Sequence, residues 1–229
     1  MQKVVVLTGA GVSAESGLST FRDAGGLWEG HDVMEVASPG GWTRNKELVL
    51  KFYNERRTQL KTAQPNDAHI AIASLEEKYD VTVITQNVDD LHERAGSSNV
   101  IHLHGELIKA RSSLDADLIY NIGYQEIQLG DKCAKGSQLR PHIVWFGEMV
   151  PMIEVAADIS STADIFIVVG TSLVVYPAAS LIEFTKTSIP KYIIDPVKPD
   201  MFYFSDNIKF IEEKAGIGMP KLATELLFN

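Results

Sequence analysis

Carboxamide and carboxylate side chains directly follow a short apolar run in the middle of the chain. Val81–Ile84 leads into Gln86, Asn87 and Asp89. Groups of these types suit the recognition of an amide ligand and of sugar hydroxyls. The alternative for Asn87 and Asp89 is structural, because both residue types commonly cap the helix that follows them.

Two histidines stand at or near the end of the next apolar run. His104 follows Val100–Leu103 directly and precedes Gly105. An imidazole titrates near neutral pH and can remove a proton, so His104 at a strand end is interpreted as functional. His102 lies within the run and is interpreted as a packing residue. Because the carboxyl ends of parallel strands share one edge, His104 should lie near Asn87.

A glycine-rich turn follows the first apolar run, Val4–Leu7. Gly9-x-Gly11-x-x-Ala14 fits the dinucleotide pattern, in which free backbone N–H groups approach a phosphate pair. The alternative is a tight strand-to-helix turn without a ligand. A dehydrogenase would also need an acidic residue after a second strand, and Asp23 falls in a loop with no such strand before it. The pattern therefore favours a dinucleotide but not hydride transfer.

The elements that must position these residues alternate along the chain. Six short apolar runs are continuous rather than alternating, which is typical of parallel strands buried on both faces. They are Val4–Leu7, Val81–Ile84, Val100–Leu103, Ile143–Phe146, Ile165–Val169 and Tyr192–Ile194. Helical patterns over 66–76, 152–160, 178–187 and 46–61 separate some of them. The fold class is therefore predicted to be α/β, a Rossmann-like doubly wound parallel sheet with a small inserted helical or irregular module.

Length and charge set the limits on organisation and partners. The 229 residues predict one domain, with a core over about 1–29, 66–104 and 143–229 and a module over about 30–65 and 105–142. A net charge of −9 disfavours nucleic acid and anionic lipid. The single cysteine and the absence of a long apolar run predict a cytoplasmic protein without a membrane span. The oligomeric state stays open, a monomer included.

Five ordered segments resemble the sirtuin family of NAD-dependent protein lysine deacylases. They are Gly9–Ser13 with Ser16-Gly17 and Phe21-Arg22, Thr85–Asp89, His102–Gly105, Val144–Glu148 and Gly170–Ser172. The resemblance spans nearly the whole chain. It implies an NAD co-substrate and acyl-lysine proteins or peptides as partners.

The resemblance also implies a role for each matching position. His104 would be the catalytic base, with Asn87 and Asp89 beside it. The NAD-binding positions would be Gly9, Ala10, Gly11, Glu15, Phe21, Arg22, Trp28, Gln86, Asn87, Val88, Asp89, Gly170, Thr171, Ser172, Asp195, Pro196, Val197 and Ala215. Asp195 stands where the family usually has Asn, which keeps an acceptor but loses a donor.

Acyl-lysine binding is implied for two further segments. Val144, Trp145, Phe146, Gly147 and Glu148 would pair with an extended peptide whose lysine enters a tunnel. In the family the acyl oxygen attacks the anomeric carbon of NAD as nicotinamide leaves. The base then acts on the ribose hydroxyls, and the products are free lysine, nicotinamide and O-acyl-ADP-ribose.

Tyr53 and Arg56 lie three residues apart and so share one face of the helix predicted over 46–61. A phenol and a guanidinium can together bind a carboxylate. The pair resembles that of the class III branch, which acts on succinyl-, malonyl- or glutaryl-lysine, and Ala37 matches a small residue that leaves the acyl site roomy. The alternative is a solvated helix face, because this helix is rich in charge.

The sequence departs from the family in one respect. Most sirtuins hold a structural zinc with two cysteine pairs, whereas residues 105–142 offer only Cys133, with Ser112 near a first cysteine position. We therefore expect no zinc. Two other functions stay open, an ADP-ribosyltransferase on the same fold and a silent module that binds NAD or acyl-lysine.

Overall fold

The computed structural model describes residues 1–18, 27–28, 30–199 and 207–228, and a parallel six-stranded sheet forms its centre. The strands are β1 (Lys3–Thr8), β4 (Asp80–Thr85), β5 (Val100–His102), β9 (Ile165–Val169), β10 (Lys191–Ile194) and β11 (Ile208–Ile211). Their spatial order is β11-β10-β9-β1-β4-β5. Numbered along the chain this is the 3-2-1-4-5-6 order of the Rossmann fold, so the predicted fold class is confirmed.

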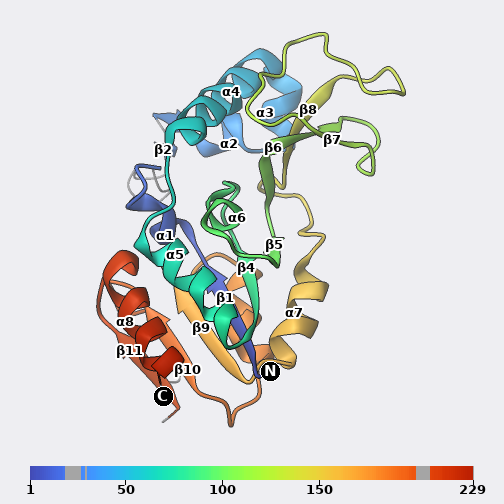
Figure 1. Cartoon of the computed structure of the whole chain (residues 1–229). Helices are drawn as coiled ribbons and strands as arrows, with labels where there is room; N and C mark the ends of the chain where they lie inside the picture. The colour runs from blue at the N-terminus through green and yellow to red at the C-terminus, as the bar shows by residue number, and fades with distance from the viewer. Residues whose placement is uncertain (19–26, 29, 200–206, 229) are drawn as a thin grey trace.

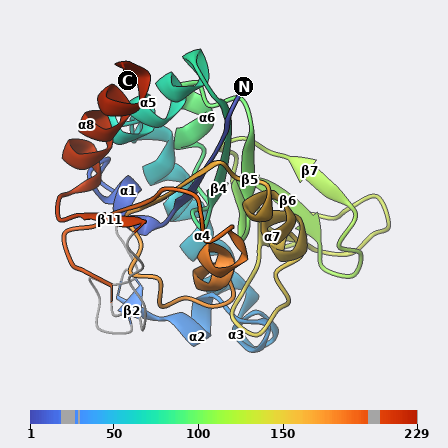
Figure 2. The same ribbon diagram turned by 90° about the horizontal axis from the view of Figure 1, so that it is seen from below.

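Helices cover both faces of this sheet because its central strands are apolar on both sides. Val4 and Val6 pack toward α5 (Asp67–Ser74) and α8 (Ala215–Phe228). Val5 and Leu7 pack toward α7 (Ile153–Ser161) and the 3₁₀ helix η3 (Ala178–Phe184). Figure 2 shows α7 and the α5–α8 pair on opposite sides of the strands. Within the described part of the chain, no helix combines the length and apolar character that crossing a bilayer demands.

A smaller module lies beyond one end of the sheet, at the top of Figure 1. It contains α2 (Val33–Val36), α3 (Pro39–Arg44), α4 (Lys46–Thr62), β6 (Gly105–Ser112), β7 (Ile119–Asn121) and β8 (Leu139–Ile143). β6 pairs antiparallel with both β7 and β8. The short strands β2 (Leu27–Trp28) and β3 (His31–Asp32) form a separate pair. A second apolar core joins α4 to β6, β8 and Trp145.

Local capping explains where two of the predicted helices begin. Asn66 Oδ1 accepts the Ala68 amide at 3.0 Å and His69 Nδ1 accepts the Asn66 amide at 3.3 Å, a reciprocal cap at the start of α5. Asn45 Oδ1 accepts the Leu48 amide at 3.0 Å at the start of α4. A further short helix, α6 (Leu91–Ala95), ends at Gly96 in the left-handed conformation.

The observed elements differ from the predicted ones in four respects. Ile143–Phe146 is not a strand of the main sheet, because the apolar run begins where β8 ends and β8 pairs with β6. The sixth main strand is β11, an edge strand whose half-exposed pattern hides it in the sequence. The segment over 178–187 forms a 3₁₀ helix that ends at Phe184. The inserted module also contains a three-stranded sheet in addition to its helices.

Candidate active site

A cavity of about 980 Å³ lies between the carboxyl edge of the main sheet and the small module. After β1 the chain adds β4 and β5 on one side of the sheet, whereas after β9 it adds β10 and β11 on the other side. The carboxyl ends of β1 and β9 therefore form the switch point of the sheet, where ligands of doubly wound folds bind. Its lining comes from the ends of β1, β4, β9 and β10, from α4, and from the segment that follows β8. Residues from both parts of the chain therefore meet around one volume.

The structure brings together almost all of the predicted site residues that it describes. Those that line the cavity are Gly9, Ala10, Gly11, Glu15, Trp28, Ala37, Tyr53, Arg56, Gln86, Asn87, Val88, Asp89, His104, Val144, Trp145, Phe146, Gly147, Glu148, Gly170, Thr171, Ser172, Asp195, Pro196 and Ala215. Val197 does not line it and is 67% exposed. Phe21 and Arg22 lie outside the described residues.

Several lining residues were missed by the sequence analysis. They are Ser13, Ala14, Leu18, Leu107, Ile143, Val150, Val174, Val175, Tyr176, Pro177 and Lys214. Ser13 has a signal in the sequence, because it lies one turn into the glycine-rich segment and its hydroxyl can bond to a polar neighbour. Val174, Val175 and Tyr176 are exposed apolar residues whose place at the cavity depends on the path of the chain after β9.

The glycine turn packs backbone against backbone at the switch point. The Gly9 amide donates to Val169 O at 3.1 Å and the Gly11 amide donates to Gly170 O at 2.8 Å. These two N–H groups are therefore not free for a phosphate, which corrects the expectation from the pattern. A Cβ on Gly11 would lie 2.8 Å from Gly170 O, and a Cβ on Gly170 would lie 2.4 Å from the Val12 nitrogen. Only glycine allows this close junction at the floor of the cavity.

A buried chain of hydrogen bonds joins the glycine turn to the loop after β4. Asn87 Nδ2 donates to Gly9 O at 3.0 Å and to Ser13 Oγ at 3.1 Å. The Ser13 hydroxyl donates in turn to Asp89 Oδ2 at 2.9 Å. Burial raises the pKa of Asp89, although these hydrogen bonds to its carboxylate oppose the shift. Asp89 Oδ1 also accepts the Leu91 amide at 3.2 Å at the start of α6, and Asp89 lines the cavity.

His104 presents a single nitrogen to the cavity. Its Nδ1 lies 2.9 Å from Gln86 O, and a carbonyl oxygen can only accept, so Nδ1 carries the hydrogen. Nε2 then holds the lone pair. Burial lowers the pKa of His104, and the hydrogen bond to Gln86 opposes this shift in part. The imidazole is therefore neutral and basic at Nε2 near neutral pH.

His102 has the opposite character. Its Nδ1 donates to Asn87 O at 3.1 Å, and its Nε2 lies 2.8 Å from Glu93 Oε1. Burial acts to lower the pKa of His102, but the hydrogen bond to Glu93 and the charges of Glu93 and Glu106 together raise it. With both ring nitrogens engaged and the charge paired, His102 supports the loop instead of reacting, as the sequence indicated.

Polar side chains from the ends of β9 and β10 line one part of the cavity. The buried Asp195 follows β10, and its Oδ1 accepts the Val197 amide at 3.0 Å. Thr171 Oγ1 accepts Gln86 Nε2 at 3.2 Å across the switch point. Glu15 Oε1 accepts the Gly216 amide at 2.9 Å, which ties the start of α8 to the glycine-rich segment.

One end of the cavity is aromatic and carries a cation. Tyr53 and Arg56 are both buried on α4 and both line the cavity, so this face of the helix is not solvated. The Arg56 guanidinium lies 4.7 Å from the Trp28 ring centroid. The buried Trp28 Nε1–H has no acceptor among the described residues, and the Tyr53 hydroxyl accepts Trp145 Nε1 at 3.0 Å. Donors and positive charge therefore converge here.

Most backbone amides of the segment after β8 donate hydrogen bonds within the protein. Val144, Trp145, Phe146 and Glu148 donate their N–H groups to His104 O, Glu148 Oε2, Ala37 O and Trp145 O. The bond to Ala37 ties this segment to α2. A partner peptide therefore has fewer N–H donors available on this segment than the sequence suggested.

The residues around Cys133 do not fit a structural zinc ion. Cys133 Sγ lies 3.1 Å from Ser137 Oγ, and Ser137 Oγ lies 2.7 Å from Ser112 Oγ. Hydrogen bonds from Ser112 and Ser137 lower the pKa of Cys133 to about 7. One thiol and two hydroxyls lack the four Cys or His ligands of a structural zinc site, and hydrogen bonds join them instead.

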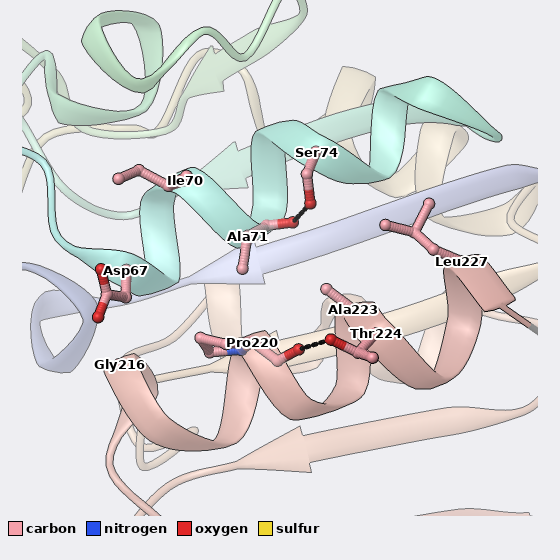
Figure 3. Close-up of a pocket in the computed structure, with 9 residues that line it drawn as sticks. All are labelled: Asp67, Ile70, Ala71, Ser74, Gly216, Pro220, Ala223, Thr224 and Leu227. Carbon is pink, nitrogen blue, oxygen red and sulfur yellow. Dashed lines mark hydrogen bonds between the residues drawn. The ribbon is translucent and has the colours of Figure 1, made fainter.

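A second cavity of about 360 Å³ lies between α5 and α8 (Figure 3). Ile70 and Leu227 are among its lining residues, and Figure 3 shows Ala71 and Ala223 pointing toward the opposite helix. The hydroxyls of Ser74 and Thr224 bond to carbonyls of their own helices. This lining is apolar apart from Asp67 at one end. It offers no arrangement of acid, base and nucleophile.

Comparisons with known proteins agree with the geometry of the large cavity. Residues 9–177 match the Sir2 family. The chain is 52% identical over 227 residues to an NAD-dependent protein deacylase of Helicobacter pylori, covering 99% of this chain and 98% of the relative. It is 51% identical over 235 residues to one of Bacteroides thetaiotaomicron, covering 99% of each.

Solved structures show the same family likeness. A Sir2 homolog–NAD complex superposes with a TM-score of 0.88 at 43% identity, covering 99% of this chain and 90% of that one. A Sir2 homologue mutant bound to ADP ribose gives a TM-score of 0.90 at 42% identity, covering 99% and 92%. A Sir2–p53 peptide–NAD⁺ complex gives 0.80 at 32% identity, covering 99% and 94%. The chain belongs to the Sir2, or sirtuin, family.

Proposed function

We propose that this protein removes acyl groups from lysine side chains in an NAD-dependent reaction. The observation that carries the proposal is the shared cavity of about 980 Å³, in which the neutral His104 lies with the glycine junction and the cationic aromatic end. The hydrogen-bonded chain of Asn87, Ser13 and Asp89 lines the same cavity. The relatives named above as NAD-dependent protein deacylases and the Sir2–NAD complex support the same assignment.

The residues around the switch point fit NAD. Gly9, Ala10 and Gly11 carry little or no side chain where they line the cavity, so a phosphate pair can approach this segment closely. Asp195 offers a carboxylate to ribose hydroxyls, and Asn87 and Asp89 lie where a carboxamide and a second ribose can be recognised. NAD supplies an activated sugar carbon whose bond to nicotinamide breaks during the reaction.

His104 acts as the general base of the proposed reaction. Its Nε2 takes the proton from a ribose hydroxyl, because Nδ1 already donates to Gln86 and burial keeps the ring neutral. Asn87 and Asp89 orient the sugar, and their mutual bonding through Ser13 holds both side chains in place. The carboxylate of Asp89 also stabilises positive charge that develops on the sugar.

We infer that the preferred acyl groups are short and end in a carboxylate, such as succinyl, malonyl or glutaryl. Arg56 can form a charge-assisted bond with that carboxylate, and the Tyr53 hydroxyl lies on the same face of α4. The small Ala37 lines the same cavity. Acetyl-lysine lacks the carboxylate, so it would be accepted less efficiently.

Mass-resolved product analysis tests both the NAD-dependent deacylation and the preference for acidic acyl groups. Acetyl-, succinyl-, malonyl- and glutaryl-lysine peptides of one sequence would be incubated with the protein, each with and without NAD. We expect free lysine, nicotinamide and O-acyl-ADP-ribose only with NAD, and the fastest turnover on the carboxylate-bearing peptides. ADP-ribose attached to a protein or peptide without loss of the acyl group would instead establish an ADP-ribosyltransferase. No product in any reaction would establish a silent binding module.

We also propose that the small module folds without zinc. Hydrogen bonds join the side chains of Ser112, Cys133 and Ser137, and the module core joins Leu107, Ala110 and Ile127 to α4, which supports folding without a metal. Elemental analysis of the purified protein should find less than one tenth of a zinc ion per chain. One zinc ion per chain, retained during dialysis against a chelator, would refute this.

A further inference from the structure

One buried hydrogen bond links the proposed peptide-binding segment to the acyl end of the cavity. Trp145 Nε1–H donates to the Tyr53 hydroxyl oxygen at 3.0 Å, and both side chains are almost fully buried. An indole N–H can only donate, so the phenol oxygen is fixed as the acceptor of this pair. The phenol hydrogen must then be directed to a different acceptor.

The indole ring is clamped and cannot easily turn away from Tyr53. The Arg140 guanidinium lies 3.2 Å from the Trp145 ring centroid, and the Trp42 ring centroid lies 5.8 Å from it. Arg140 is itself held, because it donates to Glu148 Oε1 at 2.7 Å and to Ile143 O at 3.0 Å. Glu148 closes the arrangement by accepting the Trp145 amide at 2.8 Å.

Tyr53 stays a neutral donor in this environment. Burial raises the pKa of Tyr53 strongly, and the bond from Trp145 and the charges of Arg140 and Arg56 offset only part of this shift. Among the described residues, no acceptor is bonded to the Tyr53 hydroxyl hydrogen. A carboxylate in the cavity would supply one, and Arg56 lies one helical turn away on the same face of α4.

We propose that Trp145 is a positioning residue for acyl selectivity, whose indole N–H orients the Tyr53 hydroxyl so that it donates to the carboxylate of the acyl group. The inference rests on the proposed preference for acidic acyl groups. It assigns to Trp145 a role beyond packing beside the peptide. Without the indole N–H, the phenol would be free to rotate its hydrogen away from the substrate, and discrimination between succinyl- and acetyl-lysine would fall.

An isosteric replacement tests this with little change in shape. β-(3-Benzothienyl)alanine at position 145 keeps the bicyclic ring and its stacking on Arg140 but removes the N–H. The readout is the ratio of kcat/KM on succinyl-lysine to that on acetyl-lysine peptides of identical sequence. We expect this ratio to fall about 3- to 10-fold, chiefly through a higher KM for the succinyl peptide, as loss of an oriented hydrogen bond to a charged group implies.

Two controls separate this role from a packing effect. The same replacement at Trp42, which contacts the Trp145 ring, should leave the ratio unchanged. In a Tyr53→Phe background, replacement at 145 should lower the ratio no further, because the hydroxyl that it orients is absent. Thermal unfolding of each variant checks that the fold is retained.

The possible outcomes separate a failure of the Trp145 role from a failure of the acyl preference. If the wild-type protein prefers succinyl-lysine but the position 145 isostere keeps the full ratio, the role of Trp145 is refuted and the acyl preference stands. An independent, multiplicative loss in the Tyr53→Phe background would also refute it. If the wild-type protein shows no preference for succinyl-lysine, the acyl preference itself fails, and the role of Trp145 fails with it.

Discussion

The Nδ1 atom of His104 lies 2.9 Å from the backbone oxygen of Gln86, and this contact decides which nitrogen of the ring can react. Gln86 belongs to the loop after β4, whereas His104 follows β5. The two strands are neighbours and run parallel, with Thr85 opposite His102. The register of the sheet therefore places the carbonyl of one loop where it fixes the imidazole of the next.

Replacing His104 with Ala should remove turnover while NAD binding persists. In the proposed reaction the imidazole supplies general-base catalysis, whereas the glycine junction and Asp195, which we propose bind NAD, belong to other elements that line the cavity. We expect kcat to fall at least about a hundredfold. Steady-state kinetics and calorimetric titration with NAD would measure the two properties separately. His142→Ala, which alters a half-buried histidine outside the cavity, is the control. Turnover at the wild-type rate in the His104 variant would rule out its role as the base.

The pH dependence of the reaction should reflect the environment of His104. Burial lowers the pKa of this base, so its neutral, reactive form persists to a lower pH than that of an exposed histidine. Activity should therefore be complete at neutral pH and decline only below about pH 6.5, the ordinary value for imidazole. A profile of kcat/KM between about pH 5.5 and 9 checks this. An acidic limb centred above pH 7 would contradict it.

Arg56→Met should change acyl selectivity more than catalysis. Removal of the buried guanidinium eliminates a charge-assisted bond to the acyl carboxylate, which corresponds to about ten- to a hundredfold in kcat/KM on succinyl-lysine. The acetyl peptide makes no such bond and should lose much less. Lys51→Met serves as the control, because the Lys51 side chain lies on the same helix and is 75% exposed. Equal losses on both peptides in the Arg56 variant would defeat the selectivity role.

The sequence was sufficient for five of the six strands of the main sheet and for most of the cavity lining, because both depend on local patterns. Continuous apolar runs such as Ile165–Val169 identify buried parallel strands, and polar residues at strand ends such as Asn87 must then meet at one edge. The same run pattern was misleading at Ile143–Phe146, because apolar character does not specify which sheet a strand joins.

Contacts between distant segments could not be predicted from sequence patterns. The engagement of the Gly9 and Gly11 amides by Val169 and Gly170 depends on how closely β1 and β9 approach each other. The bond from Trp145 to Tyr53 joins residues 92 positions apart and depends on the packing of the module. In both cases the chemistry of each residue was evident, but its partner was not.

Gly170→Ala should weaken both folding and NAD binding. Gly170 has a φ of +63°, and an added Cβ would lie 2.4 Å from the Val12 nitrogen. The left-handed conformation costs about 1–2 kcal/mol for a non-glycine residue, and the contact with backbone should add about 1–3 kcal/mol. Gly136→Ala isolates the first contribution, because Gly136 has a φ of +80° with open space around its α-carbon. Urea unfolding of both variants would show the difference, and equal destabilisation would mean that the junction tolerates a side chain.

Buried histidines should make the fold sensitive to acid. His69 and His92 are buried with ring centroids 4.8 Å apart, and burial lowers the pKa of His69 to about 4 and that of His92 well below its ordinary value. In the unfolded chain both titrate near pH 6.5. Between these values the unfolded state binds protons that the folded state does not, so the free energy of unfolding falls as the pH falls.

His69→Gln tests this origin of acid sensitivity while preserving the local cap. A glutamine oxygen can accept the Asn66 amide as His69 Nδ1 does, so α5 should keep its start. Between about pH 7.5 and 5.5 the variant should lose about 1 kcal/mol less stability than the wild type. His102→Gln should act in the opposite sense, because the folded state raises the pKa of His102 and its protonation stabilises the fold at low pH. Urea unfolding at the two pH values measures both, and parallel pH dependences in the wild type and the His69 variant would place the sensitivity elsewhere.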